Sequence, residues 1–359
     1  MIRLLKFGTH YLWNNLILEA SLRSGRTLTK PSQAYVLWTG RCNFRCRMCK
    51  IRDDRDKLTT AELRDVIDQL ADWGVPKITI SGGEPMLFKE EFFGLLDHAG
   101  KKGLFTHFAT NGTGLDDEAI THYSRMGGGQ ITLSLDGARP ETQNTLRGHG
   151  HAWRYVMDAL DAYERTRPEN VIFKIETVIH DENLHEVLDI YRIARERGVI
   201  FHPQPYDTQD FFTQSREVSF DDIRDRYPLW ISRENMGALR RLVDRLKAIK
   251  RADPYWIMST EEQLESIYRY FARELDYTGK CLVGYTSLFV LQDGSVTMCL
   301  YEKLGNIRED GLQDLWRSKR FEAVRREMLL CDRPCLNGCA QRLGTLQIVR
   351  MGMRHLLGR

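Results

Sequence analysis

Six short runs rich in Ile, Val, Thr and aromatic residues recur along the first 206 residues, and they constrain the fold more than any other feature. They span residues 34–39, 77–81, 104–110, 130–136, 171–179 and 199–206. Each of the first five precedes a segment with helical periodicity. Strands joined through helices pair in parallel by right-handed crossovers. The pattern predicts an α/β fold, either a partial (β/α)6 barrel of the TIM type or a doubly wound sheet, with its chemistry at the carboxyl ends of the strands.

Local motifs also predict where two of the helices begin and end. Thr59 and Glu62 have the spacing of a capping box, and Gly74 is placed to end that helix. The fifth helix is expected over residues 183–197, just before Gly198.

The pattern changes beyond residue 206. Residues 216–278 have helical periodicity without strand-like runs, and Asp293-Gly294 between two β-prone runs predicts a hairpin. We therefore expect five regions: a basic amphipathic segment, the α/β core, a helical linker, a small α+β domain and a basic tail. They cover residues 1–33, 34–215, 216–280, 281–342 and 343–359.

The formal net charge of +3 is unevenly distributed. Residues 1–30 and residues 340–359 each carry a net charge of +4, so the residues between them carry −5. Nucleic-acid binding requires a basic face on the fold itself, so we expect no nucleic-acid partner.

The eight cysteines are expected to be reduced thiols. The chain has no apolar run of about 18 residues that would predict a membrane-spanning helix. It also has no recognisable secretory signal, so we expect a cytoplasmic protein. In a reducing compartment, cysteines hold metals or take part in catalysis more often than they form disulfides.

The first cysteine cluster follows the first predicted strand. Cys42, Cys46 and Cys49 have the spacing C-x3-C-x2-C. Three thiolates on one loop can hold an iron–sulfur cluster, which usually takes four, and one iron would then stay open for a ligand. A zinc site completed by His10 or His98, or three unrelated buried cysteines, are the alternatives.

Short motifs mark the ends of the next three strands: Ser-Gly-Gly-Glu-Pro at 81–85, Ala-Thr-Asn-Gly at 109–112 and Ser-Leu-Asp-Gly at 134–137, with Arg147-Gly148 beyond. Together with the cysteine loop, this set over about residues 35–210 resembles the radical S-adenosylmethionine (SAM) superfamily. Met48 departs from it, because many members carry an aromatic residue there, and an adaptable apolar residue is a tolerable replacement.

The resemblance implies a cofactor pair and a reaction. The three cysteines would ligate a [4Fe-4S] cluster, whose open iron the amino and carboxylate groups of SAM would chelate. A reductant such as flavodoxin or ferredoxin would supply one electron, and SAM would break into methionine and a 5′-deoxyadenosyl radical. That radical would abstract a hydrogen atom from the substrate, which makes the chain an oxidoreductase or transferase-type enzyme.

Several residues are candidates for binding SAM. Glu84 offers a carboxylate for the ammonium group, and the planar guanidinium of Arg147 suits the carboxylate. The glycines allow close approach of a ligand, and the short polar groups suit the ribose or the methionine moiety. Glu176, inside the fifth strand, would contact a ligand or pair with Lys174 or an arginine. The remaining candidates are Gly82, Gly83, Asn111 and Ser134. The ordinary alternatives are a surface arginine and turn-forming Asn and Ser.

The second cysteine cluster lies near the C-terminus: Cys281, Cys299, Cys331, Cys335 and Cys339. A cysteine after a hairpin, followed by C-x3-C-x3-C, resembles the auxiliary-cluster domains called SPASM or twitch. Five cysteines are too few for two fully ligated clusters, so we expect one auxiliary [4Fe-4S] cluster on Cys281, Cys299 and two of the other three. A structural zinc site is the alternative. An auxiliary electron carrier favours an oxidative modification, either dehydrogenation or formation of a C–X or C–C bond.

The substrate is less constrained. His202, Gln204 and Tyr206 lie at the end of the sixth predicted strand and are candidates for substrate contact or for proton or hydrogen-atom donation. Only about 33 residues precede the first strand, which disfavours a leader-binding domain for a peptide substrate. The first hypothesis is a lipid, isoprenoid or carrier-linked molecule at a membrane, and the second is a peptide or a sugar-like small molecule. A non-catalytic metal-binding scaffold is the alternative of a different class.

The two tails carry the membrane hypothesis, because both combine apolar residues at helical spacing with basic residues. Such a helix either contacts a membrane surface peripherally, here at the inner face of the membrane, or packs on the open side of the barrel. The apolar residues are Ile2, Leu4, Leu5, Phe7, Tyr11, Leu12, Trp13, Leu16 and Ile17, and then Leu343, Leu346, Ile348, Val349, Met351, Met353, Leu356 and Leu357.

Overall fold

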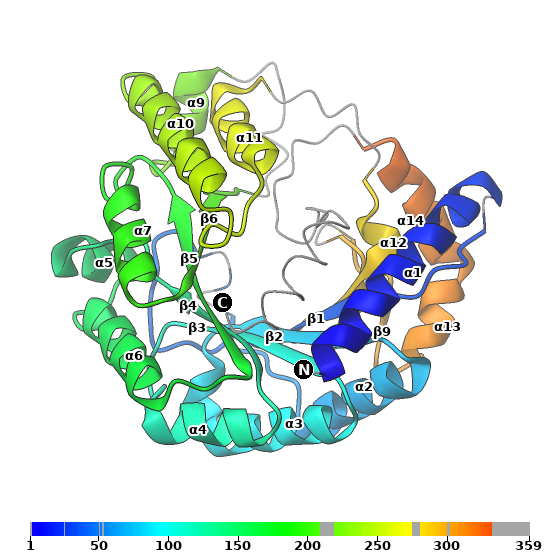
Figure 1. The fold of residues 1–359 in the computed structure, drawn as a ribbon. Helices are drawn as coiled ribbons and strands as arrows, with labels where there is room; N and C mark the ends of the chain where they lie inside the picture. Colours follow the sequence, from blue (N-terminus) through cyan, green and yellow to red (C-terminus); the bar gives the residue numbers. More distant parts are fainter. Residues whose placement is uncertain are drawn as a thin grey trace.

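A curved sheet wrapped by helices is the framework of the molecule (Figure 1). The computed structural model describes residues 2–24, 26–49, 51, 54–208, 219–274, 281–299 and 302–331, without the side chains of residues 2–5 and 220. Within these residues the sheet has nine strands in the order β6-β5-β4-β3-β2-β1-β7-β8-β9. The first six pair in parallel and form the partial barrel. They are β1 (Gln33–Thr39), β2 (Lys77–Gly82), β3 (Phe105–Thr110), β4 (Gly129–Ser134), β5 (Val171–Ile179) and β6 (Ile200–Pro205).

Helices between the strands cover the convex face of the sheet (Figure 1). The first of them shows why they form: Thr59 and Glu62 complete a capping box, and Gly74 ends the helix at a φ of 82°. Its buried residues recur at helical spacing and face the sheet. The helices are α2 (Thr60–Trp73), α3 (Lys89–Lys101) after the short η1 (Pro85–Phe88), α4 (Asp117–Arg125), α5 (Pro140–Arg147), α6 (Ala152–Thr166) and α7 (Val187–Glu196).

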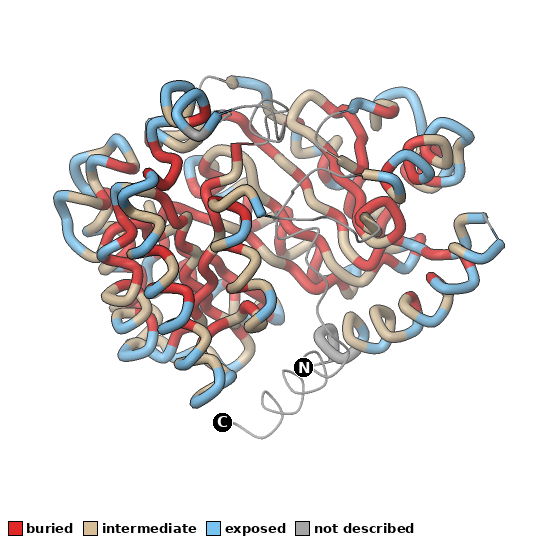
Figure 2. Tube along the Cα trace, turned by 90° about the horizontal axis from the view of Figure 1, so that it is seen from above, coloured by how far each residue is buried: buried red, intermediate tan, exposed pale blue. Residues whose placement is uncertain are grey.

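The two faces of the parallel strands differ in character. On the convex face, aromatic side chains pack against the helices, as in the stacking of Phe173 on Tyr163 of α6 with ring centroids 4.2 Å apart. Successive strand residues point to opposite faces, so the neighbours Lys174 and His202 lie on the concave face. Figure 2 shows buried residues along the strands and on the inner sides of the helices. The apolar core therefore lies between the sheet and its helices, and the concave face is left for polar groups.

A helical segment follows β6 and protects its free edge. It consists of α9 (Phe220–Arg226), α10 (Met236–Ala252) and α11 (Glu261–Ala272). Before α11 the chain runs beside β6: the amide of Phe201 donates to Trp256 O at 2.8 Å, and the amide of Met258 donates to Phe201 O at 2.8 Å. These bonds satisfy backbone groups that an uncovered edge strand would expose.

The C-terminal part continues the same sheet. It contains α12 (Val283–Thr286), β7 (Ser287–Val290), β8 (Ser295–Thr297), β9 (Gly305–Asn306), α13 (Leu312–Arg317) and α14 (Lys319–Leu329). β7 pairs in parallel with β1, and β7 and β8 form the antiparallel hairpin predicted around Asp293-Gly294. Trp316 packs edge-on against Trp73 of α2 at 5.8 Å. This part, expected as a small domain, is thus joined to the core by both sheet pairing and helix packing.

Helix α1 (Ile2–Ser24) packs near the amino ends of the parallel strands. Phe7 stacks on Phe105 at the start of β3 with a centroid distance of 6.3 Å. Asn14 is buried, and its side-chain nitrogen donates to Lys30 O at 2.5 Å and to Ser32 Oγ at 3.0 Å. Among the described helices, α1 included, none combines the length and apolar character needed to cross a bilayer.

Most predicted bounds agree with the structure to within a residue or two, but the fifth helix begins later than expected. We predicted it over residues 183–197, and α7 spans Val187–Glu196. The reason is Asn183, whose side-chain oxygen accepts from the amide of His180 at 3.0 Å and whose nitrogen donates to Asp136 O and Val178 O at 2.8 Å. These bonds hold the chain in turns before the helix starts.

Candidate active site

The cysteine loop follows β1 at the carboxyl edge of the sheet, and its three cysteines are half-buried free thiols. The amide of Phe44 donates to Cys42 Sγ at 3.3 Å, and the amide of Cys49 donates to Cys46 O at 3.1 Å. Phe44 itself is buried and stacks on His149 with ring centroids 4.5 Å apart. The loop is thus anchored by an aromatic residue that lies between two of its cysteines.

The electrostatics of the three thiols suit a cationic partner. Burial, helped by the negative charges of Glu84, Cys46 and Cys49, raises the pKa of Cys42 to about 11, against the hydrogen bond from the amide of Phe44. Burial also raises the pKa of Cys46, against the effect of Arg147. Three neighbouring thiolates repel one another unless metal cations neutralise them, so the donor set fits an iron–sulfur cluster. Across the described part of the chain, no group of three His, Cys, Asp or Glu is arranged around one metal ion.

Two glycines at the carboxyl end of β2 pack directly on the end of β1 and the start of the cysteine loop. An added Cβ on Gly82, whose φ is 124°, would lie 3.2 Å from Thr39 N and closest to Thr39 O. An added Cβ on Gly83 would lie 2.6 Å from the carbonyl carbon of Arg41 and closer still to its oxygen. The amides of Gly83 and Glu84 donate to Thr39 O at 2.5 Å and to Arg41 O at 2.9 Å. We expected these glycines to allow approach of a ligand, and in the structure they allow approach of the loop backbone.

Glu84 links three loops. It is 1% exposed, its Oε1 accepts from the amide of Met86 at 3.0 Å and from Thr110 Oγ1 at 2.8 Å, and its Oε2 accepts from the amide of Asn111 at 2.7 Å. Burial raises its pKa to about 7, against these hydrogen bonds. We expected the carboxylate to receive the ammonium of SAM, and the structure adds a positioning role that the motif alone did not indicate.

Asn111 and Ser134 stand at the ends of β3 and β4. Asn111 is buried, its side-chain nitrogen donates to Asn43 Oδ1 in the cysteine loop at 2.9 Å, and its oxygen accepts from the amide of Thr113 at 2.9 Å. Ser134 is half-buried and lies in register with Glu176 of β5. Both residues therefore lie at the same edge of the sheet as the cysteine loop.

Arg147 lies beside the cysteine loop but forms a buried ion pair. Its Nη2 lies 2.6 Å from Asp136 Oδ2, and its Nη1 lies 3.9 Å from Cys46 Sγ. Asp136 is fully buried, and Arg147 is buried except for 12% of its side chain. Its Nε has no partner among the described residues and is also buried. We expected Arg147 to meet the SAM carboxylate. The sequence did not point to Asp136 as its partner, although Asp136 belongs to the Ser-Leu-Asp-Gly motif.

Glu176, the last candidate for SAM binding, is paired. Its Oε2 lies 2.7 Å from Lys174 Nζ and 3.2 Å from His202 Nδ1. The charge of Lys174 and the hydrogen bond with His202 lower the pKa of Glu176 well below its usual range, against its burial. The alternative of a pair with Lys174 is therefore the one that the structure contains.

The three candidates at the end of β6 have different surroundings. His202 is buried, and Gln204 Nε2 lies 3.3 Å from His202 Nδ1. Tyr206 is buried and packs edge-on against Tyr227 at 6.5 Å. His202 and Gln204 thus belong to the polar concave face, whereas Tyr206 packs against the segment that follows α9.

Further polar residues on the concave face were not identified from the sequence. His107 Nε2 lies 2.8 Å from Thr132 Oγ1, and His107 Nδ1 lies 3.1 Å from Thr79 Oγ1. Lys77 begins β2 on the same face. Parallel strands buried on both faces are usually apolar throughout, so the polar residues at alternate positions in these strands would have indicated a ligand-facing surface.

Two cysteines of the C-terminal part, Cys299 and Cys331, influence the titration of Cys281 although they lie far from it in the sequence. Burial raises the pKa of Cys281, and the negative charges of Cys331 and Cys299 raise it further. Cys281 precedes α12, Cys299 follows β8 and Cys331 follows α14. Cys335, Cys339 and the whole basic tail lie outside the described residues.

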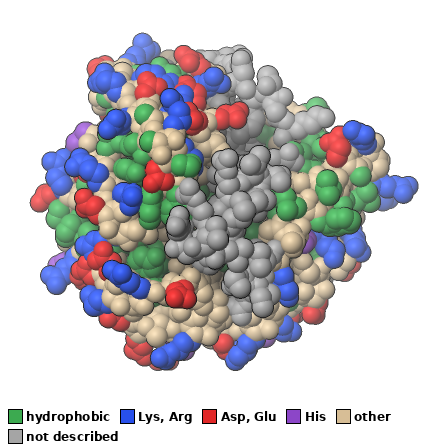
Figure 3. Space-filling model, viewed as in Figure 1, with side chains coloured by type: hydrophobic (Ala, Val, Ile, Leu, Met, Phe, Trp, Pro, Cys, Tyr) green, Lys and Arg blue, Asp and Glu red, His purple; other side chains and the backbone are tan. Residues whose placement is uncertain are grey.

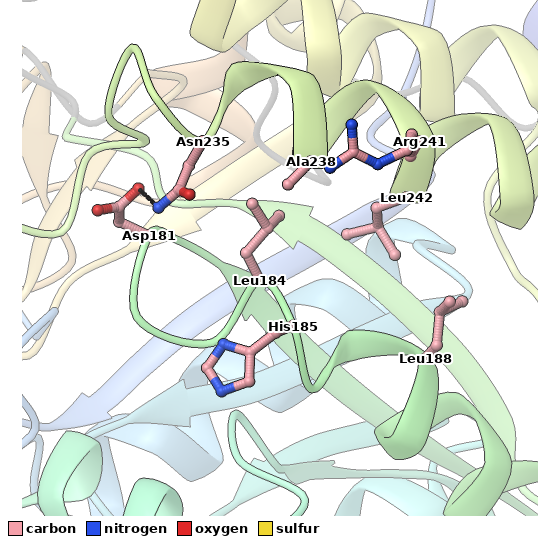
Figure 4. A pocket seen from close by; sticks show the side chains of 8 residues that line it. All are labelled: Asp181, Leu184, His185, Leu188, Asn235, Ala238, Arg241 and Leu242. Carbon is pink, nitrogen blue, oxygen red and sulfur yellow. Dashed lines mark hydrogen bonds between the residues drawn. The ribbon is translucent and has the colours of Figure 1, made fainter.

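A pocket of about 270 Å³ opens between α10 and the segment that leads into α7 (Figure 4). It is lined by Asp181, Leu184, His185, Leu188, Asn235, Ala238, Arg241 and Leu242. The carboxylate of Asp181 accepts from Asn235 at 3.0 Å, from the amide of Ser232 at 2.7 Å and from Arg224 at 2.7 Å. None of the lining residues is a predicted site residue.

Both the parallel core and the C-terminal part of the chain match known protein families. Residues 36–194 match the sequence model of the Radical SAM superfamily, and residues 281–341 match that of an iron-sulfur cluster-binding domain, SPASM. A radical SAM core binds SAM and a [4Fe-4S] cluster, and a SPASM domain binds auxiliary iron–sulfur clusters. These cofactors agree with the two groups of cysteines described above.

Individual relatives support the same assignment. The AdoMet-dependent heme synthase of Methanosarcina barkeri is 29% identical over 79% of this chain and 82% of its own length. The PqqA peptide cyclase of Bradyrhizobium diazoefficiens is 27% identical over 50% of this chain and 47% of its own length. SuiB of Streptococcus suis, bound to its precursor peptide SuiA, shares the fold with a TM-score of 0.65 at 17% identity, over 85% of this chain and 69% of that one. The chain is therefore an enzyme of the radical SAM superfamily, with a C-terminal SPASM domain that binds iron–sulfur clusters.

Proposed function

We propose that this enzyme oxidatively modifies a lipid, isoprenoid or carrier-linked substrate that reaches the concave face of the barrel from a membrane surface. The observation that carries the proposal is α1, which packs near the amino ends of the strands with one face and presents exposed apolar residues on the other.

The ligand assignment follows the two groups of thiols. Cys42, Cys46 and Cys49 hold the cluster that binds SAM, because they share one loop at the carboxyl edge of the sheet. Cys281 and Cys299, with two of Cys331, Cys335 and Cys339, hold one auxiliary cluster. The influence of Cys299 and Cys331 on the pKa of Cys281 supports this second set.

The residues around the cysteine loop position the cofactors. The reduced cluster and SAM together supply a 5′-deoxyadenosyl radical when both are bound. Gly83 and Glu84 fix the loop through backbone hydrogen bonds, and Asn111 ties it to the end of β3. Ser134, at the edge, and Arg147, through its unpartnered Nε, remain available to the polar groups of SAM.

The proposed outcome is a product two electrons more oxidised than the substrate. The substrate gives a hydrogen atom to the radical, which becomes 5′-deoxyadenosine. An auxiliary cluster held by the C-terminal cysteines would accept one electron from the substrate radical, and His202 on the concave face is a candidate acceptor for its proton. Burial and the charge of Lys174 lower the pKa of His202, so its imidazole is neutral and can take a proton.

The membrane contact follows from the exposed face of α1. Trp13 is 64% exposed and Leu16 is 70% exposed. Exposed basic residues, Lys6 and Arg23, lie toward the two ends of the same helix, and Arg26 follows it. In Figure 3, hydrophobic side chains gather at the right of the molecule, where Figure 1 places α1, with Lys and Arg beside them. Tryptophan flanked by basic residues is typical of helices that lie in the interface of an anionic bilayer.

Vesicle flotation tests the membrane contact. We expect the enzyme to float with vesicles of 30 mol% phosphatidylserine, and flotation to fall at least severalfold in a Trp13→Ala/Leu16→Ala variant. Leu87→Ala, which alters an exposed leucine on η1 at 42% exposure, is the matched control. Unchanged flotation of the double variant, or no flotation of the unaltered enzyme, would contradict the proposal.

Two relatives favour other substrates. The M. barkeri relative is named a heme synthase, and the similarity covers most of both chains, which makes heme formation a second candidate. The PqqA peptide cyclase favours a peptide. Substrate-dependent formation of 5′-deoxyadenosine separates these candidates, because only the true class of substrate should raise its rate above that of the uncoupled reaction.

A further inference from the structure

The concave face of the sheet is charged rather than merely polar. Its ionisable residues come from four strands: Lys77 of β2, His107 of β3, Lys174 and Glu176 of β5, and His202 of β6. They act on one another, since Lys77 and Lys174 both influence the titration of His107. No helix between the parallel strands covers this face, because those helices pack on the convex one (Figure 1).

Most of these groups satisfy one another. Lys174 Nζ lies 2.7 Å from Glu176 Oε2 and 3.1 Å from His202 Nδ1. His107 is held by Thr79 and Thr132 through its two ring nitrogens. The carboxylate of Glu176 therefore balances the charge of Lys174. The imidazoles of His107 and His202 are neutral, because burial lowers the pKa of each.

Lys77 is the exception. Its ammonium has no hydrogen-bond or ion-pair partner among the residues that the structure describes, and Nζ lies over the ring of Phe7 of α1, 5.4 Å from its centroid. Burial and the like charge of Lys174 lower its pKa to about 8, so it is still mostly protonated at pH 7. Among the residues that the structure describes, the face thus carries one positive charge in excess. Lys77 is half-buried. An ammonium that is partly removed from water without a counter-charge is costly, and the cost falls when an anion is supplied from outside.

We propose that Lys77 and Lys174 bind an oxyanion of the substrate, a phosphate or a carboxylate, on the concave face of the barrel. The inference rests on the proposed function only in placing the substrate on this face. Lysine ammoniums recognise phosphate and carboxylate as point charges, and His107, between the two lysines, adds a polar wall.

The position of Lys77 along β2 indicates the orientation in which the substrate binds. Lys77 is the first residue of β2 and Gly82 the last, so at about 3.3 Å per residue they are separated by roughly 17 Å. The SAM site lies at the Gly82 end. The oxyanion is therefore held toward the amino ends, beside α1, and the hydrogen atom is taken from a carbon several bonds away from it. At this end Phe7 of α1 stacks on Phe105, so apolar rings lie beside the Lys77 ammonium.

Binding of simple amphiphiles to the full cluster-loaded enzyme tests the proposal. Decyl phosphate, decanoate and 1-decanol share one chain and differ in charge, and inorganic phosphate and acetate show whether the anion binds without a chain. Isothermal titration at pH 7 should show binding of one or both charged amphiphiles, at least tenfold tighter than that of decanol. The tighter of the two identifies the oxyanion, and inorganic phosphate or acetate should compete with it.

Substitutions of Lys77 test whether this residue binds the anion. Lys77→Met should weaken the charged amphiphile by on the order of tenfold or more, as expected for loss of one charge-assisted contact, and Lys77→Arg should retain most of the affinity. Lys101→Met, at a lysine on α3 with 74% of its side chain exposed, is the control and should change nothing. If Lys77→Met does not fold, the unaltered enzyme still decides, because its affinity for the anion should fall as the pH rises from 7 to 9.5 and Lys77 loses its charge.

Equal binding of decanol and the charged amphiphiles, or unchanged affinity in a folded Lys77→Met, would overturn the proposal. The result is independent of vesicle flotation: anion binding without flotation removes the membrane proposal and keeps this site, and flotation without anion binding does the reverse.

Discussion

Replacing Gly83 with alanine tests whether the glycine pair holds the cysteine loop at the distance that a cluster requires. The backbone of Gly83 does not have a positive φ, so alanine is conformationally allowed and the effect is steric. The added Cβ would lie 2.6 Å from the carbonyl carbon of Arg41. Carbon atoms pack at about 3.5–4.0 Å, so the two loops must separate by roughly 1 Å.

Such a separation has a calculable cost. It would stretch the hydrogen bond from the amide of Glu84 to Arg41 O, now 2.9 Å, beyond hydrogen-bonding distance. A lost buried hydrogen bond costs about 1–3 kcal/mol, and overpacking adds about 1–3 kcal/mol. A misplacement of about 1 Å near reacting groups also lowers rates by roughly a hundredfold.

The assay is anaerobic reconstitution with iron and sulfide, followed by iron analysis and by measurement of 5′-deoxyadenosine with SAM and dithionite. Gly83→Ala should lose most of the core cluster and form 5′-deoxyadenosine at least a hundredfold more slowly. Gly94→Ala is the control, because an added Cβ in α3 meets nothing within 4 Å, and it should be neutral or slightly stabilising. Wild-type iron content and rate in Gly83→Ala would refute the reasoning.

Three further predictions concern buried charge and the second cluster. Arg147→Met should lower the free energy of unfolding of the cluster-free protein by about 3–5 kcal/mol, because it leaves Asp136 buried without its cation. In denaturant titrations this loss of stability should grow as the pH rises, since protonated Asp136 needs no partner. The double variant Arg147→Met/Asp136→Asn should recover part of the lost stability. The raised pKa of Glu84, about 7, means that the folded state binds more protons than the unfolded state between about pH 4.5 and 7. Stability should therefore fall as the pH rises through that range, and Glu84→Gln should lose this slope; an unchanged slope would show that another group causes it. Cys281→Ala should reduce the iron content from about eight to about four per chain and keep formation of 5′-deoxyadenosine, and an unchanged count would mean that Cys281 is not a ligand.

The sequence predicted those parts of the fold and the site that depend on local patterns of residue types. Alternating strand and helix patterns predicted the parallel core, because crossovers between such elements have one favoured geometry. The Asp293-Gly294 hairpin followed from local turn chemistry. The spacing of the cysteines identified the loop at the carboxyl edge, where Cys42 is found.

The rest depended on contacts between residues distant in the sequence. Nothing local to Asp136 indicated that it would neutralise Arg147, and nothing in the run after Cys281 indicated that β7 would pair with β1. The charged concave face was visible in principle, because Lys77 begins one predicted strand and Lys174 and Glu176 lie inside another. Its significance required knowing which face the helices leave uncovered.

We infer that a cluster on three cysteines cleaves SAM and that a second cluster is bound by the C-terminal cysteines. One measurement tests both statements. Iron and 5′-deoxyadenosine are quantified in the anaerobically reconstituted enzyme and in a Cys42→Ala/Cys46→Ala/Cys49→Ala variant. We expect about eight irons and SAM cleavage in the former, and about four irons and no 5′-deoxyadenosine in the latter. Cleavage of SAM by the triple variant, or an unaltered enzyme that makes no 5′-deoxyadenosine with reductant present, would contradict the inference.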